Sequence, residues 1–401
     1  MSETSRSTIV NMTGPMTDAA LPQVLRVLGD SGLRLLSLRQ SREFGGASVT
    51  AVLGGELPAR ESETLKTLAR EWGVDLTLRA GDAQPGAACV CLTILGDQTR
   101  TAIAELLDCA RAHGFAAREI RPLGGRLFLG IDVLLETISG APVETVPEGL
   151  RRAILAQSAK LGVDVALQKN DFFRTNRRLL CMDVDSTFVK GEFIDEMASL
   201  AGIKDQVAAI TARAMRGELD FPSALRERVR LLKGLPMEKA LSLCEHFELT
   251  PGAEDLVRSL KRLGIRVGLV SGGFDFFVEK LKAKFELDFA FANQLEVKDG
   301  HLTGEVVGTI VDGQRKAQVL RDMAKVYDLD LRQTIAAGDG ANDMFMLEAA
   351  GLGIAYQAKP RLLEFADACF NHHDRLDTML YLMGFDAPEV QRNACTAGLD
   401  P

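Results

Sequence analysis

Two carboxylates stand two positions apart, directly after a short apolar run that is predicted to be a buried strand. The run is 179–182, and the carboxylates are Asp183 and Asp185, followed by Ser186 and Thr187. Like charges at this distance raise each other's pKa unless a cation lies between them. A divalent metal such as Mg²⁺ is one solution, because carboxylate oxygens are its preferred ligands. A pair of helix-capping side chains is another, because Asp and Ser both favour helix N-termini.

Groups that suit the same chemistry follow two other apolar runs. The predicted strand at 334–337 leads into Gly338-Asp339-Gly340-Ala341-Asn342-Asp343, whose glycines allow a tight turn with carboxylates and an amide at its tip. The predicted strand at 267–270 leads into Ser271-Gly272-Gly273, whose hydroxyl and backbone N–H groups suit an anion. Ligands of open α/β sheets bind beyond the carboxyl ends of the strands, so we expect these groups to meet there. Lys316, which taken alone would be assigned to the surface, is expected to join them.

In this order the segments resemble the four motifs of the haloacid-dehalogenase superfamily of phosphatases. The finer resemblance is to phosphoserine phosphatases, over about residues 178–385. It includes an insert between the first two motifs, with Glu192 and the segments 214–221 and 225–229. No P-loop pattern is present, which disfavours a nucleotide-driven kinase.

The resemblance implies a chemical role for each residue of the first and last motifs. Asp183 is expected to attack phosphorus and form an aspartyl-phosphate, while Asp185 is expected to act as general acid and then as general base. Mg²⁺ is expected to be held by Asp183, Asp339 and a backbone carbonyl. That carbonyl belongs to Val184, which is preferred to the Asp185 side chain as a ligand. Asp343 is expected to orient a metal-bound water or the motif lysine.

The resemblance also implies how the substrate is held. Ser271 and Lys316 are expected to hold the transferring phosphoryl oxygens. The residues expected to bind substrate are Glu192, Met215, Phe221, Arg228, Ser271, Gly272, Lys316 and Asn342.

A mainly helical segment at about 193–250 is predicted to form a small cap over the ligand end of the sheet. In this interpretation Glu192 pairs with the ammonium of phosphoserine, and Arg228 grips its carboxylate in a bidentate fork. Met215 and Phe221 would supply apolar walls. Without the resemblance, Glu192 and Arg228 would be assigned to a solvated helix surface.

The first 170 residues are predicted to contain two copies of a βαββαβ unit, the ferredoxin-like arrangement. We divide the chain into units at 1–84 and 85–168 and a Rossmann-like parallel α/β phosphatase domain at 169–401. The two units resemble ACT domains, which sense small ligands, but neither carries the Asp-x-Pro-Gly turn of that family. Sensing of an amino acid, with L-serine as the candidate, and assembly alone both stay open. We expect a homodimer or higher homo-oligomer held by residues 1–168, and a solvated linker at 169–178.

Composition excludes several classes of protein. The chain has 401 residues, 47 Lys and Arg against 55 Asp and Glu, and a net charge of -8, so a large nucleic-acid footprint is not expected. No apolar run approaches the roughly 20 residues of a membrane span, and the N-terminus lacks a secretory pattern, so we expect a cytoplasmic protein. Seven cysteines without disulfide or zinc spacing are expected to be small buried thiols rather than redox groups.

The expected function is hydrolysis of O-phospho-L-serine to L-serine and phosphate, the last step of serine biosynthesis, as the resemblance implies. Two alternatives remain. One is a phosphatase of the same superfamily for another small phosphomonoester. The other is a non-catalytic amino-acid sensor or scaffold, which the complete set of acid, hydroxyl and lysine positions disfavours.

Overall fold

The computed structural model of the chain describes residues 7–17, 20–43, 46–81, 90–96, 99–123 and 130–385. The chain separates into two compact units, Met1–Ala87 with Gly140–Pro142 and Ala88–Ser139 with Val143–Pro401. Within the described residues the first unit holds a four-stranded sheet and the second an eleven-stranded sheet.

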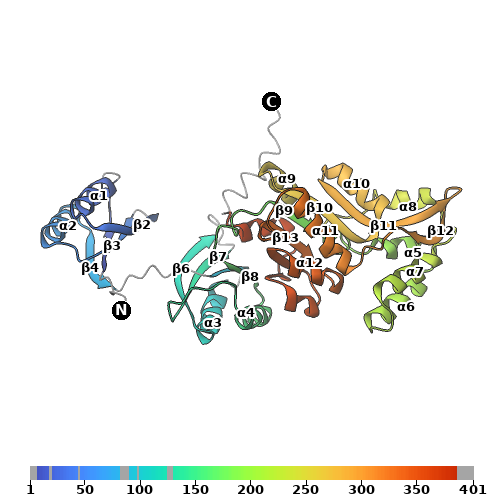
Figure 1. Cartoon of the computed structure of the whole chain (residues 1–401), viewed down its shortest axis with the longest axis horizontal. Coiled ribbons are helices and arrows are strands. Elements are labelled where there is room, and N and C mark those ends of the chain that lie inside the picture. The colour runs from blue at the N-terminus through green and yellow to red at the C-terminus, as the bar shows by residue number, and fades with distance from the viewer. Residues whose placement is uncertain are drawn as a thin grey trace, which may run out of the picture. The chain divides into compact units, whose positions relative to one another are not determined.

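The N-terminal unit folds in the order βαββαβ, with its sheet ordered β2-β3-β1-β4. Its elements are β1 (Ser7–Gly14), α1 (Ala20–Asp30), β2 (Arg34–Glu43), β3 (Gly46–Gly54), α2 (Ala59–Trp72) and β4 (Asp75–Gly81). Both helices lie on one face of this sheet (Figure 1). Val10 and Met12 alternate along β1 and pack with Val24 of α1 and Leu65 of α2. This is the ferredoxin-like arrangement that the sequence predicts.

The second unit begins with the same arrangement. Its elements are β5 (Val90–Leu95), α3 (Thr99–Ala112), β6 (Phe115–Leu123), β7 (Gly130–Thr137), α4 (Glu148–Leu161) and β8 (Asp164–Lys169). The strands are ordered β8-β5-β7-β6, which matches the order of β4, β1, β3 and β2 in the first unit. Leu92, Leu106 and Ile154 of β5, α3 and α4 share one apolar core. The prediction of a repeated βαββαβ order is therefore confirmed.

The rest of the second unit is built on a sheet of parallel strands with helices on both faces, as the apolar runs predict. Its strands are β9 (Leu179–Met182), β10 (Arg266–Phe274), β11 (Phe289–Lys298), β13 (Thr334–Gly338), β14 (Leu352–Tyr356) and β15 (Ala368–Phe370). Their order is β11-β10-β9-β13-β14-β15, and every neighbouring pair in it is parallel. Strand β12 (His301–Val307) adds to β11 antiparallel and ends the sheet.

Alternate residues of β9 divide the core of this sheet between its two faces. Leu180 and Met182 pack in one cluster with Leu256 of α9 (Ala253–Arg262) and Val278 of α10 (Asp275–Phe285). Leu179 and Cys181 pack in another, on the face of α11 (Gly313–Val326) and α12 (Met344–Ala349). The residues just beyond β9 are thereby held at a fixed edge of the sheet.

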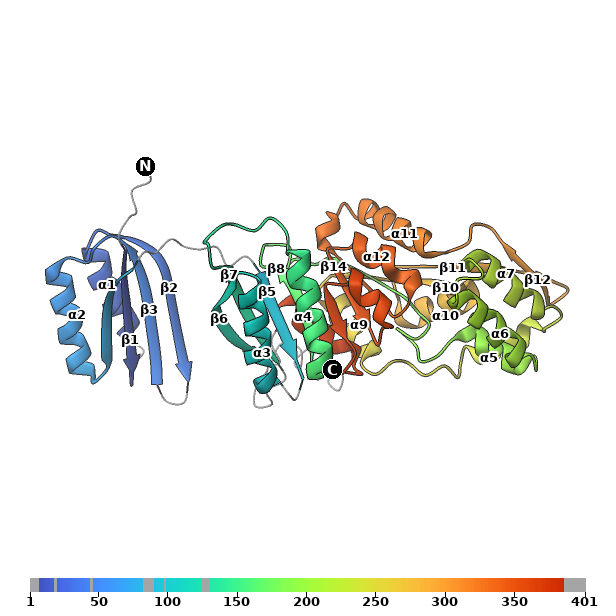
Figure 2. The same cartoon turned by 90° about the horizontal axis from the view of Figure 1, so that it is seen from below.

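Four helices follow β9 and cover that edge, as the sequence predicts for a cap. They are α5 (Phe193–Leu200), α6 (Lys204–Met215), α7 (Phe221–Leu231) and α8 (Met237–Leu243). Asp220 caps α7 by accepting a hydrogen bond from the Ser223 N–H at 2.8 Å. The chain after α7 pairs with β12, since Gly234 N–H donates to the Leu302 carbonyl at 2.8 Å. The cap is therefore fastened to the β11–β12 hairpin (Figure 2).

The parallel sheet and the ferredoxin-like sheet of the second unit are continuous. Strand β8 pairs antiparallel with β15, with Ala166 opposite Ala368 and Val165 opposite Cys369. Figure 2 shows β8 between β5 and the parallel strands. The domain boundaries proposed from the sequence stay predictions, and the sheet runs across the one at 168.

The prediction of a solvated linker at 169–178 is wrong for two of its arginines. Arg174 and Arg177 are each only 5% exposed. Arg174 pairs with the buried Asp132 of β7, and Arg177 donates to the Gln168 side chain at 3.1 Å. Charged side chains are buried only when they are paired or hydrogen-bonded, so this segment is a packed joint.

None of the helices in the described part of the chain combines the length and apolar character that a membrane span requires. The described cysteines form no disulfide, and Cys91, Cys181 and Cys369 are buried. Burial raises the pKa of Cys91 and of Cys369 to about 12, so these thiols stay protonated. Cys89 and Cys395 lie outside the described residues.

Candidate active site

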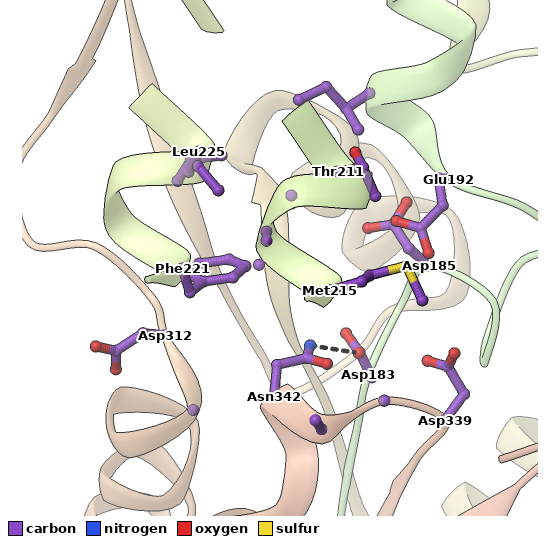
Figure 3. Close-up of a pocket in the computed structure, with 18 of the residues that line it drawn as sticks. Asp183, Asp185, Glu192, Thr211, Met215, Phe221, Leu225, Asp312, Asp339 and Asn342 are labelled. Carbon is purple, nitrogen blue, oxygen red and sulfur yellow. Dashed lines mark hydrogen bonds between the residues drawn. The ribbon is translucent and has the colours of Figure 1, made fainter. Parts of the chain in front are cut away.

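A cavity of about 660 Å³ lies beyond the carboxyl ends of the parallel strands and is roofed by the cap. In Figure 3, Met215 and Phe221 of the cap lie across it from Asp183 and Asn342 of the sheet edge. The predicted site residues that line it are Asp183, Asp185, Glu192, Met215, Phe221, Arg228, Gly272, Asp339 and Asn342. Those buried behind its wall are Val184, Ser271, Lys316 and Asp343.

Asp183 is held by groups from three segments. Its N–H continues the sheet by donating to the Ala337 carbonyl at 2.9 Å, which places the carboxylate at the strand ends. Its Oδ1 accepts from the Val184 N–H at 2.7 Å and lies 2.7 Å from the Lys316 ammonium. Its Oδ2 accepts from the Asn342 amide at 3.3 Å, as the dashed line in Figure 3 marks. This carboxylate is therefore oriented before any ligand arrives.

Lys316 is a fully buried cation between two carboxylates. Asp312 caps α11 and accepts from the Arg315 N–H at 2.9 Å, which sets Lys316 in the first turn of the helix. Its ammonium lies 2.7 Å from Asp183 and 2.8 Å from Asp343. Burial lowers the pKa of Lys316, but the two carboxylates outweigh burial and hold that pKa above its usual value. The lysine therefore stays charged.

Asp183, Asp339 and Asp343 form an acidic cluster whose carboxylate oxygens lie within 4.8 Å of one another. Burial first, and then the charge of Asp183, raises the pKa of Asp339 to about 6. The same two causes raise the pKa of Asp343 well above its usual value. Lys316 balances only part of the negative charge that three ionised carboxylates would carry. A hard divalent cation with oxygen ligands such as Mg²⁺ therefore fits the donor set.

The Asp185 carboxylate lies outside this acidic cluster and is held by other donors. The Phe193 N–H at the start of α5 donates to its Oδ1 at 2.7 Å, and the Ser271 hydroxyl donates to its Oδ2 at 3.2 Å. Burial raises the pKa of Asp185 to about 6, and the charge of Asp183 adds to this effect. A carboxyl with a pKa near neutrality can carry a proton into a reaction, which suits a general acid.

Ser271 is fully buried and does not reach the cavity surface. Its hydroxyl accepts from the Gly273 N–H at 2.7 Å and donates to Asp185. A Cβ at Gly273 would lie 2.8 Å from the Asp185 Oδ2, so only glycine allows this close approach. A phosphoryl contact of Ser271 stays a prediction.

Glu192 and Arg228 bring opposite charges to the cap side of the cavity. Glu192 lines the cavity, and the charges of Asp185, Asp183 and Asp339 act on its carboxyl. Removal from bulk water is the main cause that raises its pKa to about 8, with the charge of Asp185 next. Burial lowers the pKa of Arg228, while the charge of Glu192 acts in the opposite direction. A ligand group of opposite charge would therefore stabilise the charged form of each side chain.

Asn293 was not among the residues predicted from the sequence, although it supports two of the motifs. Its side chain is 1% exposed. The amide donates to the Gly272 carbonyl at 2.8 Å, and the amide oxygen accepts from the Val311 N–H at 2.8 Å. It thereby ties the Gly272 loop to the segment that leads into α11. An asparagine directly after the apolar run at 289–292 was the available signal, because a buried amide needs partners.

Lys359 and Arg361 also line the cavity and were missed. They follow β14, whose carboxyl end lies at the same edge of the sheet as those of β9 and β13. The position of this loop after a strand was the signal that could have found them. The charge of Lys359 lowers the pKa of Asp339, against the raising effect of burial.

Comparison with known proteins identifies the class of enzyme. Residues 180–348 match the family model of the haloacid dehalogenase-like hydrolases. A solved haloacid-dehalogenase family hydrolase from Salmonella enterica serovar Typhi aligns with a TM-score of 0.63 and 30% identity, over 73% of this chain and 98% of that one. The fold, the strand-end carboxylates and these matches define a haloacid dehalogenase-like hydrolase.

Two curated relatives narrow this class. A phosphoserine phosphatase of Mycobacterium tuberculosis is 38% identical over 96% of this chain and 95% of its own length. A phosphoserine phosphatase of Streptomyces coelicolor is 42% identical over 86% of this chain and 84% of its own length. The chain therefore belongs to the phosphoserine phosphatase family.

Proposed function

We propose that this enzyme hydrolyses O-phospho-L-serine to L-serine and phosphate, as the last step of serine biosynthesis. The observation that carries the proposal is one cavity that joins an oriented nucleophile to a pair of opposite charges. Asp183 and Asp185 lie at its floor, while Glu192 and Arg228 lie on its cap side. A phosphate ester of a zwitterionic amino acid suits both ends.

In the first step the Oδ2 of Asp183, which Lys316 does not hold, forms a bond to phosphorus, and the bond between phosphorus and the seryl oxygen breaks. Asp185 enters this step protonated and gives its proton to that oxygen, which a pKa of about 6 supports. In the second step water attacks phosphorus, Asp185 takes the proton of that water, and the bond to Asp183 breaks. Lys316 holds the Oδ1 of Asp183 throughout, which keeps the carboxylate in the attacking orientation.

We propose that Asp183, Asp339 and a backbone carbonyl at residue 184 hold Mg²⁺, with Asp343 orienting Lys316 beside them. When bound, the ion supplies positive charge that offsets repulsion between a phosphate and the carboxylates. Ser271 and Lys316 are proposed to hold phosphoryl oxygens, together with the Gly272 backbone and Asn342.

Substrate selection is proposed to reside in the cap. Glu192 would lose its proton and pair with the ammonium, because an adjacent cation favours the carboxylate form. Arg228 would hold the carboxylate, and Met215 and Phe221 would close the apolar sides.

The test is phosphate release from a panel of esters, with and without Mg²⁺. The panel contains O-phospho-L-serine, phosphoethanolamine, which lacks the carboxylate, and glycerol phosphate, which lacks both charged groups. A clear preference for phosphoserine in kcat/KM supports the proposal. Equal activity on all three would favour the alternative of a phosphatase for other small esters, and no Mg²⁺-dependent release from any would favour a non-catalytic sensor.

We further propose that the ACT-like units assemble the chain into a homodimer or higher homo-oligomer and take L-serine as effector. A cavity of about 230 Å³ in the N-terminal unit supports the second part, because Glu56 and Arg79 line it with opposite charges. Calorimetry with L-serine tests binding, and light scattering tests the number of subunits. An effector must bind two states with different affinity, since equal affinity shifts no equilibrium.

A further inference from the structure

The loop after β14 brings a cation without a carboxylate partner to the cavity. Lys359 and Arg361 both line the cavity wall and are exposed. Within the described ranges, no hydrogen bond or ion pair joins the Lys359 ammonium to another residue. Lys316, by contrast, is already held between Asp183 and Asp343.

The carboxylates that line the cavity would repel a phosphate, and a cation beside them would offset that repulsion. Four carboxylates line the cavity close to the reacting end, those of Asp183, Asp185, Glu192 and Asp339. A phosphate dianion that approaches this floor meets like charge. Lys359 lies beside Asp339, because its N–H donates to the Asp339 carbonyl at 3.2 Å. The Lys359 ammonium therefore lies on the sheet side of the cavity and can bind a phosphoryl oxygen without first breaking an ion pair.

The turn that carries Lys359 is held in place by Asn371, the residue after β15. The Asn371 side-chain oxygen accepts from the Ala358 N–H at 2.8 Å. The Gln357 N–H donates to the Phe370 carbonyl at 2.8 Å. Gln357 has a φ of 45°, in the left-handed region that favours glycine, so the turn depends on its neighbours to keep this shape.

Asn371 is fixed in turn by a buried carboxylate from the ferredoxin-like part of the unit. Asp164, at the start of β8, has no exposed surface. Its Oδ1 accepts from the N–H groups of Asn371 at 2.8 Å and His372 at 3.0 Å. Its Oδ2 accepts from the His373 N–H at 2.8 Å and lies 2.7 Å from the ring Nδ1 of His373. A carboxylate with this many donors sets the path of the segment after β15.

We propose that Lys359 is a further phosphate-binding residue of the active site, and that Asn371 and Asp164 are positioning residues that hold it there. Through Asp164, strand β8 of the ferredoxin-like part then helps to hold one wall of the catalytic cavity in place. This inference rests on the proposed function in one respect, that the cavity takes a phosphate ester.

The first experiment measures inhibition by inorganic phosphate together with KM and kcat for phosphoserine. Lys359→Met is expected to raise the phosphate Ki and the KM about tenfold at low salt, which corresponds to about 1.4 kcal/mol. Lys359→Arg keeps the charge and should recover most of the binding. Lys325→Met, at the exposed C-terminal end of α11, is the matched control and should change neither constant. Unchanged phosphate inhibition in Lys359→Met would overturn the proposal.

The second experiment tests positioning by a double-mutant cycle. Asn371→Ala removes the acceptor for the Ala358 N–H and is expected to raise the phosphate Ki by about threefold. Asn371→Asp keeps an acceptor at that place and should restore the wild-type constant. In the Lys359→Met background, Asn371→Ala should add nothing. A full additional effect in that background, or no effect in the single variant, would refute a role through Lys359.

Asp164→Asn should act as Asn371→Ala does. If the Asp164→Asn variant fails to fold, the Asn371 and Lys359 variants still test the proposal, because both of these side chains lie outside the core. The two proposals can also fail separately. If the wild-type chain releases phosphate from p-nitrophenyl phosphate but not from phosphoserine, the substrate assignment is wrong. Phosphate inhibition of p-nitrophenyl phosphate hydrolysis then still tests Lys359.

Discussion

Replacing Arg228 by alanine tests whether the cap recognises the carboxylate of the substrate. The Arg228 Nε donates to the Ala224 carbonyl at 3.3 Å. A guanidinium has five N–H donors, so its two terminal nitrogens remain available for a bidentate contact. Charge-assisted hydrogen bonds contribute about 1.5–3 kcal/mol, so the variant is expected to lose about 10- to 150-fold in kcat/KM for phosphoserine.

The assay compares kcat/KM for phosphoserine with that for phosphoethanolamine, which keeps the ammonium and lacks the carboxylate. Arg228→Ala should change kcat/KM for phosphoethanolamine by less than about threefold, because this substrate has no carboxylate for Arg228 to hold. Arg226→Ala, on the exposed side of α7, serves as the control and should leave both values unchanged. Equal losses on the two substrates would show that Arg228 only supports the cap, and the specificity argument would be wrong.

Two further predictions concern the sheet side of the site. Asp183→Asn should abolish turnover, because an amide does not attack phosphorus, and mass spectrometry should find no fluoroberyllate adduct at residue 183. Burial raises the pKa of Asp185 and of Asp339 to about 6 from 3.8, so without metal the folded chain holds protons that the unfolded chain has lost. Stability of the metal-free protein should therefore fall as the pH rises through about 4 to 6, and Mg²⁺ should raise Tm more at about pH 7.5 than at about pH 5. An equal shift at both pH values would contradict this linkage.

The alternation of apolar runs and helical patterns was sufficient to predict the parallel sheet, and the matches confirm the fold class. Residues that directly follow β9, β10 and β13 could be assigned to one edge because strand ends of a parallel sheet share that edge. This is why Asp183, Ser271 and Asp339 were chosen from local sequence. How deeply each of these side chains is buried was not predictable in the same way. Ser271 lies behind the cavity wall because Asp185 and Gly273 take up its hydroxyl.

The interactions that the sequence did not reveal join residues far apart in the chain. Arg174 lies in a polar segment that reads as solvated, and its partner Asp132 is 42 positions away. Asn371 contacts the Asp164 carboxylate across 207 positions. No local period or composition encodes such pairs, since they depend on which strands become neighbours. The pairing of β8 with β15 brings Asp164 and Asn371 together, and it was outside what a repeat of βαββαβ units predicts.

The β8–β15 pairing makes the ferredoxin-like part of the second unit a structural support of the catalytic part. Removing residues before 170 would delete β8 and uncover the edge of β15, which has three residues. It would also delete Asp132 and Gln168, the partners of Arg174 and Arg177. Arg174 would lose its charge partner, while Arg177 would keep its contact with the Arg332 carbonyl. Breaking a buried pair by removing one member costs about 3–5 kcal/mol.

A chain that begins at Asn170 should therefore unfold at a clearly lower temperature than the full chain, by about 6–20 °C for a loss of about 3–5 kcal/mol. A chain that begins at Ala88, the first residue of the second unit, keeps β8 and should retain the Tm and kcat of the full protein. The two deletions differ only in β5–β8 and their helices, so the comparison isolates that part from the N-terminal unit. If both shortened chains melt together with the full protein, β8 is not a support for the site. The Asp164 and Asn371 contacts would then be too weak to position Lys359.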